Sequence, residues 1–275
     1  MRPYYYLGAG KGLTQLSNGL PFFVNTKDEA ISTWIILGGT WENFVDDILC
    51  GITRPGDNVL DAGANQGYYS VKLSNIIGPD GRLFAFEPNP EVFQFLESNI
   101  YINGFTGRAK IFQKALGSES GKATLNFSFN NIGGGTIVRD TVEGENTVAV
   151  EIVRGDDVIP EDVQFDVLKF DVEGSEPAAA LGLEKALARS DTAAIVIEVF
   201  PKSWSNWGDF DTILSRFTRG YRVGFEIHHD GSLEPLDLTS LSTRTDTFYA
   251  LLLPPDHWAM NFARERCRRN PAGKQ

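Results

Sequence analysis

The chain has 275 residues, of which 42% are hydrophobic and 12% aromatic, and its formal net charge at pH 7 is −11. This length is enough for one sizeable core, and the acidic balance argues against broad electrostatic binding to a nucleic acid. The two cysteines, Cys50 and Cys267, lack the spacing of a zinc site or a disulfide framework and suit a reducing compartment.

Targeting and membrane signals are missing from the sequence as given. The first residues contain no apolar stretch followed by a cleavage site, as a signal peptide would. The longest apolar run, residues 193–197, is too short to cross a bilayer. We therefore expect a soluble, cytoplasmic protein without membrane insertion.

Residues 1–50 are rich in aromatic side chains and are expected to form an N-terminal cap. The predicted elements of this cap are a short strand at 21–24, a helix from about 28 to 37 that ends at Gly38-Gly39, and a second helix at 41–50. From residue 51 the pattern changes to an alternation of strands and helices. The elements predicted next are a strand at 58–60, a helix at 69–77, a strand at 83–86, a helix from 90 to about 103, a strand at 109–112 and hairpins within 118–155.

The second half of the chain repeats this alternation and ends differently. Its predicted elements are a strand at 165–170, a helix near 177–187, a strand at 194–200, a helix at about 209–217, two strands at 221–228 and 247–253, and a tail at 256–275. Helices between strands indicate a mostly parallel, doubly wound sheet. The last two strands have no helix between them, which indicates an antiparallel pair at one edge. We expect an α/β, Rossmann-like fold with a seven-stranded sheet, as in class I methyltransferases, whose core spans residues 51–255.

The most informative segment is Val-Leu-Asp-Ala-Gly-Ala-Asn-Gln-Gly-Tyr-Tyr at 59–69, a predicted junction between a strand and a helix. Gly63 and Gly67 allow close approach of the backbone to a ligand, and the next helix begins with free N–H groups. The Gly-x-x-x-Gly spacing is wider than the Gly-x-Gly-x-x-Gly of dinucleotide sites. It favours the phosphate-free methionine part of S-adenosylmethionine, with Asp61 available for the ammonium. The alternative is that both glycines serve only a tight turn.

An acidic residue, Glu87, follows the next predicted strand. A carboxylate at this position can accept hydrogen bonds from both hydroxyls of a ribose. The alternative is that Glu87 caps the helix that begins at Pro90. Because the glycine loop and the acid follow consecutive strands in the expected order, together they favour a cofactor site.

Four motifs together resemble the FkbM-type methyltransferases. They are the run 59–70, Ala-Phe-Glu-Pro-Asn-Pro at 85–90, Lys-Ala-Leu-Gly at 114–117, and Leu-Lys-Phe-Asp-Val-Glu-Gly-Ser-Glu at 168–176. The resemblance covers residues 38 to 200, approximately. It implies a class I fold, S-adenosylmethionine as methyl donor, and O-methylation of a sugar, glycolipid or natural product.

The resemblance also implies which residues bind the cofactor. These are Glu42, Asp61, Gly63, Ala64, Asn65, Gly67, Tyr68, Glu87, Pro88, Asn89, Lys114, Ala115 and Asp171. Lys114 and Ala115 occupy the positions beside the adenine, and Glu42 faces the methionine end. The likeness fades before residue 20 and after about residue 205, where we expect substrate specificity to reside.

Methylation of a hydroxyl requires a base, and four residues near the predicted carboxyl edge of the sheet are candidates: Asp171, Glu173, Glu198 and His229. Capping of the next helix is the alternative for the acids around Gly174, and it best explains Glu176. Glu198 interrupts an apolar strand and is either a reacting group or a structural acid. His228 and His229 point to opposite faces of a strand, so at most one faces the site, and a surface hairpin is the commoner explanation.

Three further interpretations stay open. Asp171 and Glu198 could bind Mg²⁺ or Mn²⁺, although no acid cluster has clear coordination spacing. The glycine-rich stretch 130–136 is either a lid or a hairpin loop, and Trp204 and Trp207 either stack on a sugar or pack a helix. The sequence predicts an S-adenosylmethionine-dependent O-methyltransferase with a small-molecule or sugar substrate and no nucleic acid partner. The alternatives are a non-catalytic cofactor-binding protein and a protein or RNA methyltransferase.

Overall fold

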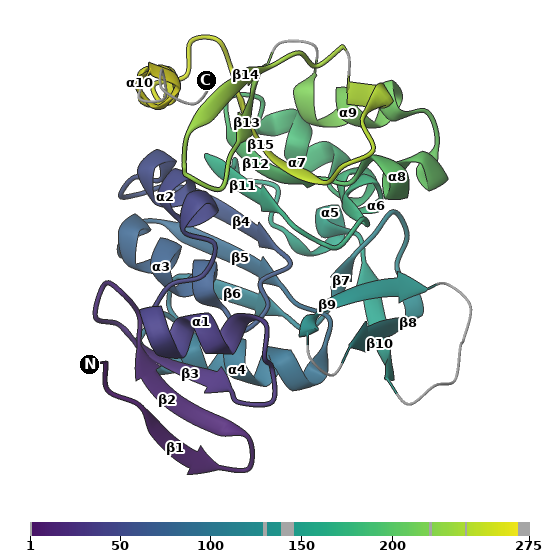
Figure 1. Ribbon diagram of the computed structural model, residues 1–275. Coiled ribbons are helices and arrows are strands. Elements are labelled where there is room, and N and C mark those ends of the chain that lie inside the picture. Colours follow the sequence, from purple (N-terminus) through teal and green to yellow (C-terminus); the bar gives the residue numbers. More distant parts are fainter. Residues whose placement is uncertain (1, 129–130, 139–145, 220–221, 240, 269–275) are drawn as a thin grey trace.

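The structure, a computed structural model, describes residues 2–128, 131–138, 146–219, 222–239 and 241–268. An eight-stranded sheet lies at its centre, with strand order β14-β13-β15-β12-β11-β4-β5-β6 (Figure 1). The strands are β4 (Asn58–Ala62), β5 (Arg82–Phe86), β6 (Ala109–Phe112), β11 (Val167–Phe170), β12 (Ala194–Val199), β13 (Val223–Ile227), β14 (Leu233–Leu236) and β15 (Phe248–Leu253).

The direction of the strands confirms the predicted fold class. Strands β6, β5, β4, β11 and β12 pair in parallel, and β15 is antiparallel to both β12 and β13. The predicted late antiparallel pair is therefore present. The expected strand count was one too low, because β14 adds an eighth strand beside β13, between the two strands predicted at 221–228 and 247–253. Its sequence, Leu-Glu-Pro-Leu, gives a weak strand signal, and a proline is tolerated there because β14 is an edge strand.

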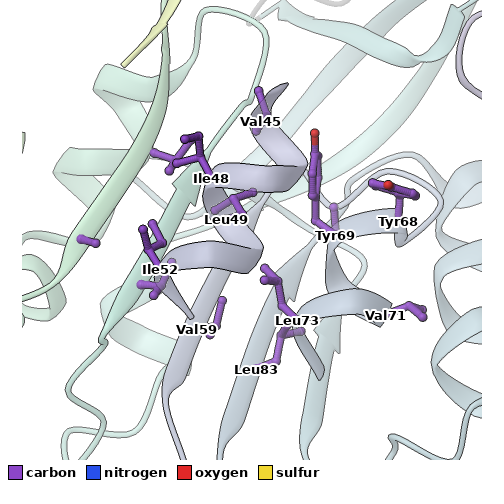
Figure 2. Close-up of a cluster of buried hydrophobic side chains, with 14 of the residues drawn as sticks. Val45, Ile48, Leu49, Ile52, Val59, Tyr68, Tyr69, Val71, Leu73 and Leu83 are labelled. Atoms are coloured by element: carbon purple, nitrogen blue, oxygen red, sulfur yellow. The ribbon is translucent and has the colours of Figure 1, made fainter. Parts of the chain in front are cut away.

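Two layers of helices cover the central sheet. The helices α2 (Asn43–Ile52), α3 (Tyr68–Ile77) and α4 (Pro90–Ile102) pack on one face, and α6 (Glu176–Gly182), α7 (Glu184–Arg189) and α9 (Phe210–Thr218) pack on the other. Successive strand residues alternate between these layers, so that Val59 belongs to the first core and Leu60 to the second. Figure 2 shows side chains of α2, including Ile48 and Leu49, near Leu73 of α3 and above Leu83 of the sheet.

One predicted helix is in fact two. The segment expected as a single helix near 177–187 is divided between α6 and α7 at Leu183. A β-carbon at Gly182 would lie 2.1 Å from the carbonyl oxygen of Gly117, so the end of α6 packs directly against the backbone of a distant loop. The spacing of apolar residues along a predicted helix gives no indication of such a tertiary contact.

The N-terminal segment contains more structure than its sequence predicts. Strands β1 (Tyr5–Gly8), β2 (Lys11–Gln15) and β3 (Pro21–Asn25) form an antiparallel sheet, followed by α1 (Ile31–Gly38). Only β3 and the two helices α1 and α2 were predicted. Phe22 and Ile35 are fully buried in the same hydrophobic cluster as Val59 of β4. The segment therefore packs as a layer of the main body.

A second, smaller sheet has strand order β7-β10-β8-β9. Its strands are β7 (Ala115–Leu116), β8 (Gly121–Ser128), β9 (Asn131–Val138) and β10 (Thr147–Val153). The hairpin of β8 and β9 confirms the expected antiparallel structure, although Asn130 of the predicted glycine-rich stretch lies outside the described residues. A β-carbon at Gly133 would lie 1.8 Å from the Asn65 amide nitrogen, so β9 rests against the loop that follows β4.

The chain ends in α10 (Met260–Arg268), whose Arg266 donates a hydrogen bond to the carbonyl oxygen of Gly231. The basic end of the sequence is thus helical as far as it is described. No helix within the described ranges has the length and apolar character needed to span a membrane.

Candidate functional site

The loop after β4 is shaped by left-handed residues. Gly63, Asn65 and Gly67 have φ of 82°, 52° and 91°. A β-carbon at Gly63 would lie 1.8 Å from the carbonyl oxygen of Asp171, and one at Gly67 would lie 2.8 Å from Leu96 Cδ1. Both glycines are therefore required by the fold itself, as the tight-turn interpretation held. Gly63 also lines the cavities described below.

Glu87 follows β5 and is 3% exposed. Its Oε2 accepts a hydrogen bond from the Asn65 backbone N–H at 3.0 Å, and its Oε1 accepts one from the Asn89 N–H at 2.8 Å. The side chain of Asn89, not that of Glu87, caps α4 by accepting from the Glu91 N–H. Burial raises the pKa of Glu87 to about 7, although the two backbone hydrogen bonds oppose this shift.

A first hollow, which we call cavity A, lies beside Glu87 and has a volume of about 470 Å³. Its lining includes Phe86, Glu87, Pro88, Lys114, Ala115, Leu116, Asp171 and Glu173. The ammonium of Lys114 is paired with the carboxylate of Glu151. The predicted positions Glu87, Pro88, Lys114 and Ala115 are thus brought together, although two follow β5 and two lie at or just before the start of β7.

A second hollow, cavity B, has a volume of about 840 Å³. It joins three groups of residues that are distant in sequence: Ala30, Ile31, Trp41 and Glu42 of the N-terminal segment; Ala64, Asn65, Gln66, Tyr68 and Tyr69 after β4; and Lys169, Asp171, Glu173, Glu198 and Tyr249 at the edge of the sheet. Cavities A and B share Gly63, Gly133, Asp171 and Glu173. They are adjoining parts of one cleft at the carboxyl ends of the parallel strands, where open α/β sheets bind ligands.

Lys169 is the central cation of this cleft and was not singled out in the sequence. It is 1% exposed, and its Nζ donates to the Gly63 carbonyl oxygen at 3.0 Å and lies 3.3 Å from both Asp61 Oδ1 and Asp171 Oδ2. Burial lowers the pKa of Lys169, but the carboxylates of Asp171 and Asp61 outweigh burial and hold it above its usual value. The sequence feature that could have identified it is a lysine within the otherwise apolar strand Val-Leu-Lys-Phe.

Asp61 lies behind Lys169. Its side chain is fully buried, accepts a hydrogen bond from the Ser70 hydroxyl at 2.6 Å, and is absent from the lining of cavities A and B. We expected Asp61 to contact the ammonium of a bound cofactor directly. In the structure its carboxylate does not reach the surface of either cavity. Asp61 instead holds Lys169, because a buried cation needs a partner of opposite charge.

Glu42 connects the N-terminal segment with two other parts of the wall of cavity B. Its carboxylate accepts hydrogen bonds from the hydroxyls of Tyr69 at 3.0 Å and Tyr249 at 3.2 Å. Burial and the neighbouring carboxylate of Asp171 raise the pKa of Glu42 to about 7. The structure thus places Glu42 in the lining of cavity B.

Glu173 and Glu198 also face the cleft, and neither accepts a hydrogen bond from another residue in the described part of the chain. Glu198 is the cross-strand neighbour of Tyr249. Burial and the charge of Asp171 raise the pKa of Glu173 to about 7 and that of Glu198 to about 9. Glu173 has a φ of 53°, a strained conformation for a residue with a side chain.

The other sequence candidates lie elsewhere. His229 is exposed, packs edge-on against Phe44 with 4.6 Å between ring centroids, and does not line cavity A or B. His228 lies 3.3 Å from Glu234 on the surface. The structure therefore does not bring either histidine to the cleft, as the surface-hairpin interpretation held.

Glu176 has a structural role, but it binds the loop before α6 and does not cap that helix, of which it is the first residue. Its carboxylate accepts hydrogen bonds from the backbone N–H groups of Val172 and Gly174, at 2.9 Å and 3.2 Å, and from the indole of Trp204 at 2.9 Å. Trp204 is fully buried and stacks on Phe210, so it packs helices. The other tryptophan considered, Trp207, is 37% exposed.

The metal alternative receives no support. Within the described ranges, no group of three or more His, Cys, Asp or Glu side chains is arranged to hold a metal ion. The carboxylates of the cleft are instead grouped around Lys169.

Comparisons with known proteins agree with the motifs. Residues 61–223, more than half of the chain, match the model of the methyltransferase FkbM domain. The chain is 28% identical over 157 residues to methyltransferase sdnD of Sordaria araneosa, covering 46% of this chain and 60% of that protein. It is 29% identical over 163 residues to the 31-O-demethyl-FK506 methyltransferase FkbM of Streptomyces tacrolimicus, covering 48% and 62%.

Other similarities are shorter or more distant. A protein-L-isoaspartate O-methyltransferase of Aeropyrum pernix is 36% identical over 58 residues, which are 21% of this chain and 22% of that protein. The chain thus spans less than two thirds of the length of these relatives. Fibrillarin of Aeropyrum pernix, solved with S-adenosyl-L-methionine, has a TM-score of 0.45 and 14% identity, covering 92% of this chain and 97% of that one. On the family match, the chain belongs to the FkbM family of methyltransferases.

Proposed function

We propose that the protein is an S-adenosylmethionine-dependent methyltransferase that methylates a hydroxyl of a small molecule, such as a sugar, glycoconjugate or natural product. The observation that carries this proposal is the adjoining pair of cavities A and B, which share Asp171 and Glu173. A relative named as a 31-O-demethyl-FK506 methyltransferase supports a hydroxyl acceptor. We also propose that the protein acts in the cytoplasm, where its two free cysteines would stay reduced.

Cavity A has the chemistry to hold an adenosine. Each oxygen of Glu87 already accepts one backbone hydrogen bond, and a carboxylate oxygen can accept a second. Two ribose hydroxyls would supply those bonds to a carboxylate that is otherwise buried at a cost. The apolar side chains of Phe86, Pro88 and Leu116 line the same cavity and suit the faces of a purine.

Cavity B has the chemistry to hold an amino acid. Its wall includes Tyr68 and Tyr69, which begin α3, and the first N–H groups of a helix are free to bind a carboxylate. Glu42 and Asp171 provide negative charge for an ammonium. Asp61 would act indirectly, because it holds Lys169 and is covered by it.

When bound, S-adenosylmethionine supplies a methyl carbon that bonds to the acceptor oxygen as the carbon–sulfur bond breaks and its electron pair stays on sulfur. The hydroxyl proton needs an acceptor, and Asp171, Glu173 and Glu198 line the cleft. Asp171 is engaged with Lys169. Of Glu173 and Glu198, a pKa of about 7 makes Glu173 the better matched to accept a proton at neutral pH, whereas a pKa of about 9 keeps Glu198 mostly protonated and able to donate a hydrogen bond.

The test is calorimetric titration of the purified protein with S-adenosylmethionine, with NAD as the control ligand. Binding of the former in the micromolar range, and no binding of NAD, is the expected result. Absence of S-adenosylmethionine binding by a folded protein would overturn the proposal. Lys202, an exposed residue of α8 (Pro201–Trp204), offers a control variant, Lys202→Ala, whose affinity should equal that of the parent.

A further inference from the structure

A third hollow, cavity C, adjoins the cleft and has a volume of about 1200 Å³. It lies between the connection from β7 to β8, strand β9, helix α6 and the short helix η1 (Ser205–Trp207). The side chains on which the argument depends are Ser118, Glu119, Thr136, Ser203, Asn206 and Trp207. None of these residues lines cavity A or B.

The three cavities meet at Glu173, which lines each of them. Cavities A and C also share Leu116 and Ile137. Cavities A and B are the parts of the cleft assigned above to the two ends of the cofactor. A molecule in cavity C would therefore reach the cofactor at the position of Glu173.

We propose that cavity C is the acceptor-binding site and that it takes a hydroxyl-bearing molecule that has no negative charge and an apolar face that packs against Trp207. This inference rests on the proposed function and adds where the acceptor lies and which charge it lacks. Reaction at a hydroxyl near Glu173 would allow this carboxylate to receive the proton directly.

The lining of cavity C favours an acceptor without negative charge. Hydroxyl and amide groups come from Ser118, Thr136, Ser203 and Asn206, and apolar surface comes from Trp207 and from Leu116, Ile137, Ile152 and Ala178. The charged side chains among its described lining residues are Glu119 and Glu173, both acidic. These carboxylates would repel an anionic acceptor. No cationic side chain among the described lining residues could compensate by forming a hydrogen bond to it.

The loop that carries Glu173 is held rigidly at the rim of this cavity. The backbone N–H groups of Val172 and Gly174 are both bound by Glu176. A β-carbon at Gly174 would lie 2.3 Å from the hydroxyl oxygen of Ser203, which donates to the Gly174 carbonyl oxygen at 3.2 Å. These contacts maintain the left-handed conformation of Glu173 and position its carboxylate.

The experiment needs no identified acceptor. Three analogues of S-adenosylmethionine are used, in which nitrogen replaces sulfur and carries a methyl, a hydroxyalkyl or a carboxyalkyl chain, the two chains having equal length. The added chain extends from the position of the transferred methyl and probes the space beyond it. Each analogue is titrated by calorimetry into the parent protein, Trp207→Ala, Glu119→Gln and the control Trp34→Ala, which changes an exposed tryptophan of α1 outside the three cavities.

We expect the parent to bind the hydroxyalkyl analogue at least as tightly as the methyl analogue, and the carboxyalkyl analogue at least tenfold more weakly. Trp207→Ala should weaken binding of the hydroxyalkyl analogue about fivefold, since the lost stacking costs about 1 kcal/mol. The affinity for the methyl analogue should be unchanged. Glu119→Gln should bind the carboxyalkyl analogue more tightly than the parent does, because one repelling charge is removed. Trp34→Ala should bind all three analogues with the affinity of the parent.

Two results would overturn the inference while the proposed function stands. One is tight binding of the methyl analogue together with exclusion of both longer chains, which would mean that no acceptor space lies beyond the methyl. The other is affinity for the hydroxyalkyl analogue that Trp207→Ala does not alter, together with a weak affinity for the carboxyalkyl analogue that Glu119→Gln does not improve, which would place the acceptor elsewhere in the cleft. Failure of the methyl analogue and of S-adenosylmethionine to bind would instead refute the proposed function.

Discussion

The α-carbon of Gly63 faces the backbone of Asp171 so closely that a β-carbon would lie 1.8 Å from the Asp171 carbonyl oxygen. This contact joins the loop after β4 to the first residue after β11. It fixes the floor that cavities A and B share, because both residues line both cavities. The packing of two strand ends thus determines the shape of the cleft.

The substitution Gly63→Ala should therefore damage both stability and cofactor binding. We expect the free energy of unfolding to fall by roughly 2–4 kcal/mol, because positive-φ strain and overpacking each cost about 1–3 kcal/mol. Chemical denaturation measures the first effect and calorimetric titration the second. Gly121→Ala is the matched control, since a β-carbon at Gly121 meets no atom within 4 Å. Equal losses in both variants would contradict this explanation.

Glu87→Gln should weaken binding of S-adenosylmethionine by roughly 10- to 100-fold, the loss of about 1.4–2.8 kcal/mol of hydrogen bonding to a charged group. Because the pKa of Glu87 is about 7, the parent should bind more tightly as pH rises from 6 to 8 and the carboxyl becomes a full acceptor. Calorimetry across this range checks both points. If the affinity of parent and variant depended on pH in the same way, Glu87 would not be a residue that binds the cofactor.

Glu198→Gln should stabilise the protein at pH 8 and leave its stability at pH 4 unchanged. An acid whose pKa rises from 4.5 to about 9 on folding binds more protons in the folded chain, so its contribution falls as pH rises through that interval. We expect a gain of roughly 1–3 kcal/mol in the free energy of unfolding at pH 8, because the parent must take up a proton at Glu198 when it folds and the variant does not. Urea denaturation at the two pH values measures it, and a destabilised variant at pH 8 would refute the argument.

Lys169→Met should cost about 3–5 kcal/mol of the free energy of unfolding, because it leaves the buried carboxylate of Asp61 without its cation. Adding Asp61→Asn to this variant should restore part of the loss, because the uncompensated charge is then gone. Lys202→Met, at an exposed position, is the control. Additive effects of the two substitutions at 61 and 169 would show that the pair is not coupled.

Much of this protein follows from local sequence. The alternation of apolar strands with helical segments determined the fold class, since helices such as α3 and α4, with 10 and 13 residues, can return the chain for parallel pairing. The glycine loop and Glu87 were recognisable because left-handed residues and an acid follow consecutive strands. Strand β14 was not predicted, because its four residues, which include Pro235, show no regular alternation of apolar and polar side chains.

Only the tertiary structure decided which polar residues share a space. Asp61 and Asp171 occupy equivalent positions near strand ends in the sequence, yet one lies behind Lys169 and the other in the cleft. Glu42 meets Tyr249 although 207 residues separate them. The direction of a side chain and its distant neighbours depend on how strands and layers pack, and this information is not contained in any short stretch of sequence. That is why the sequence identified the family, whereas the packing of β9, η1 and the loop at Glu173 revealed a third cavity.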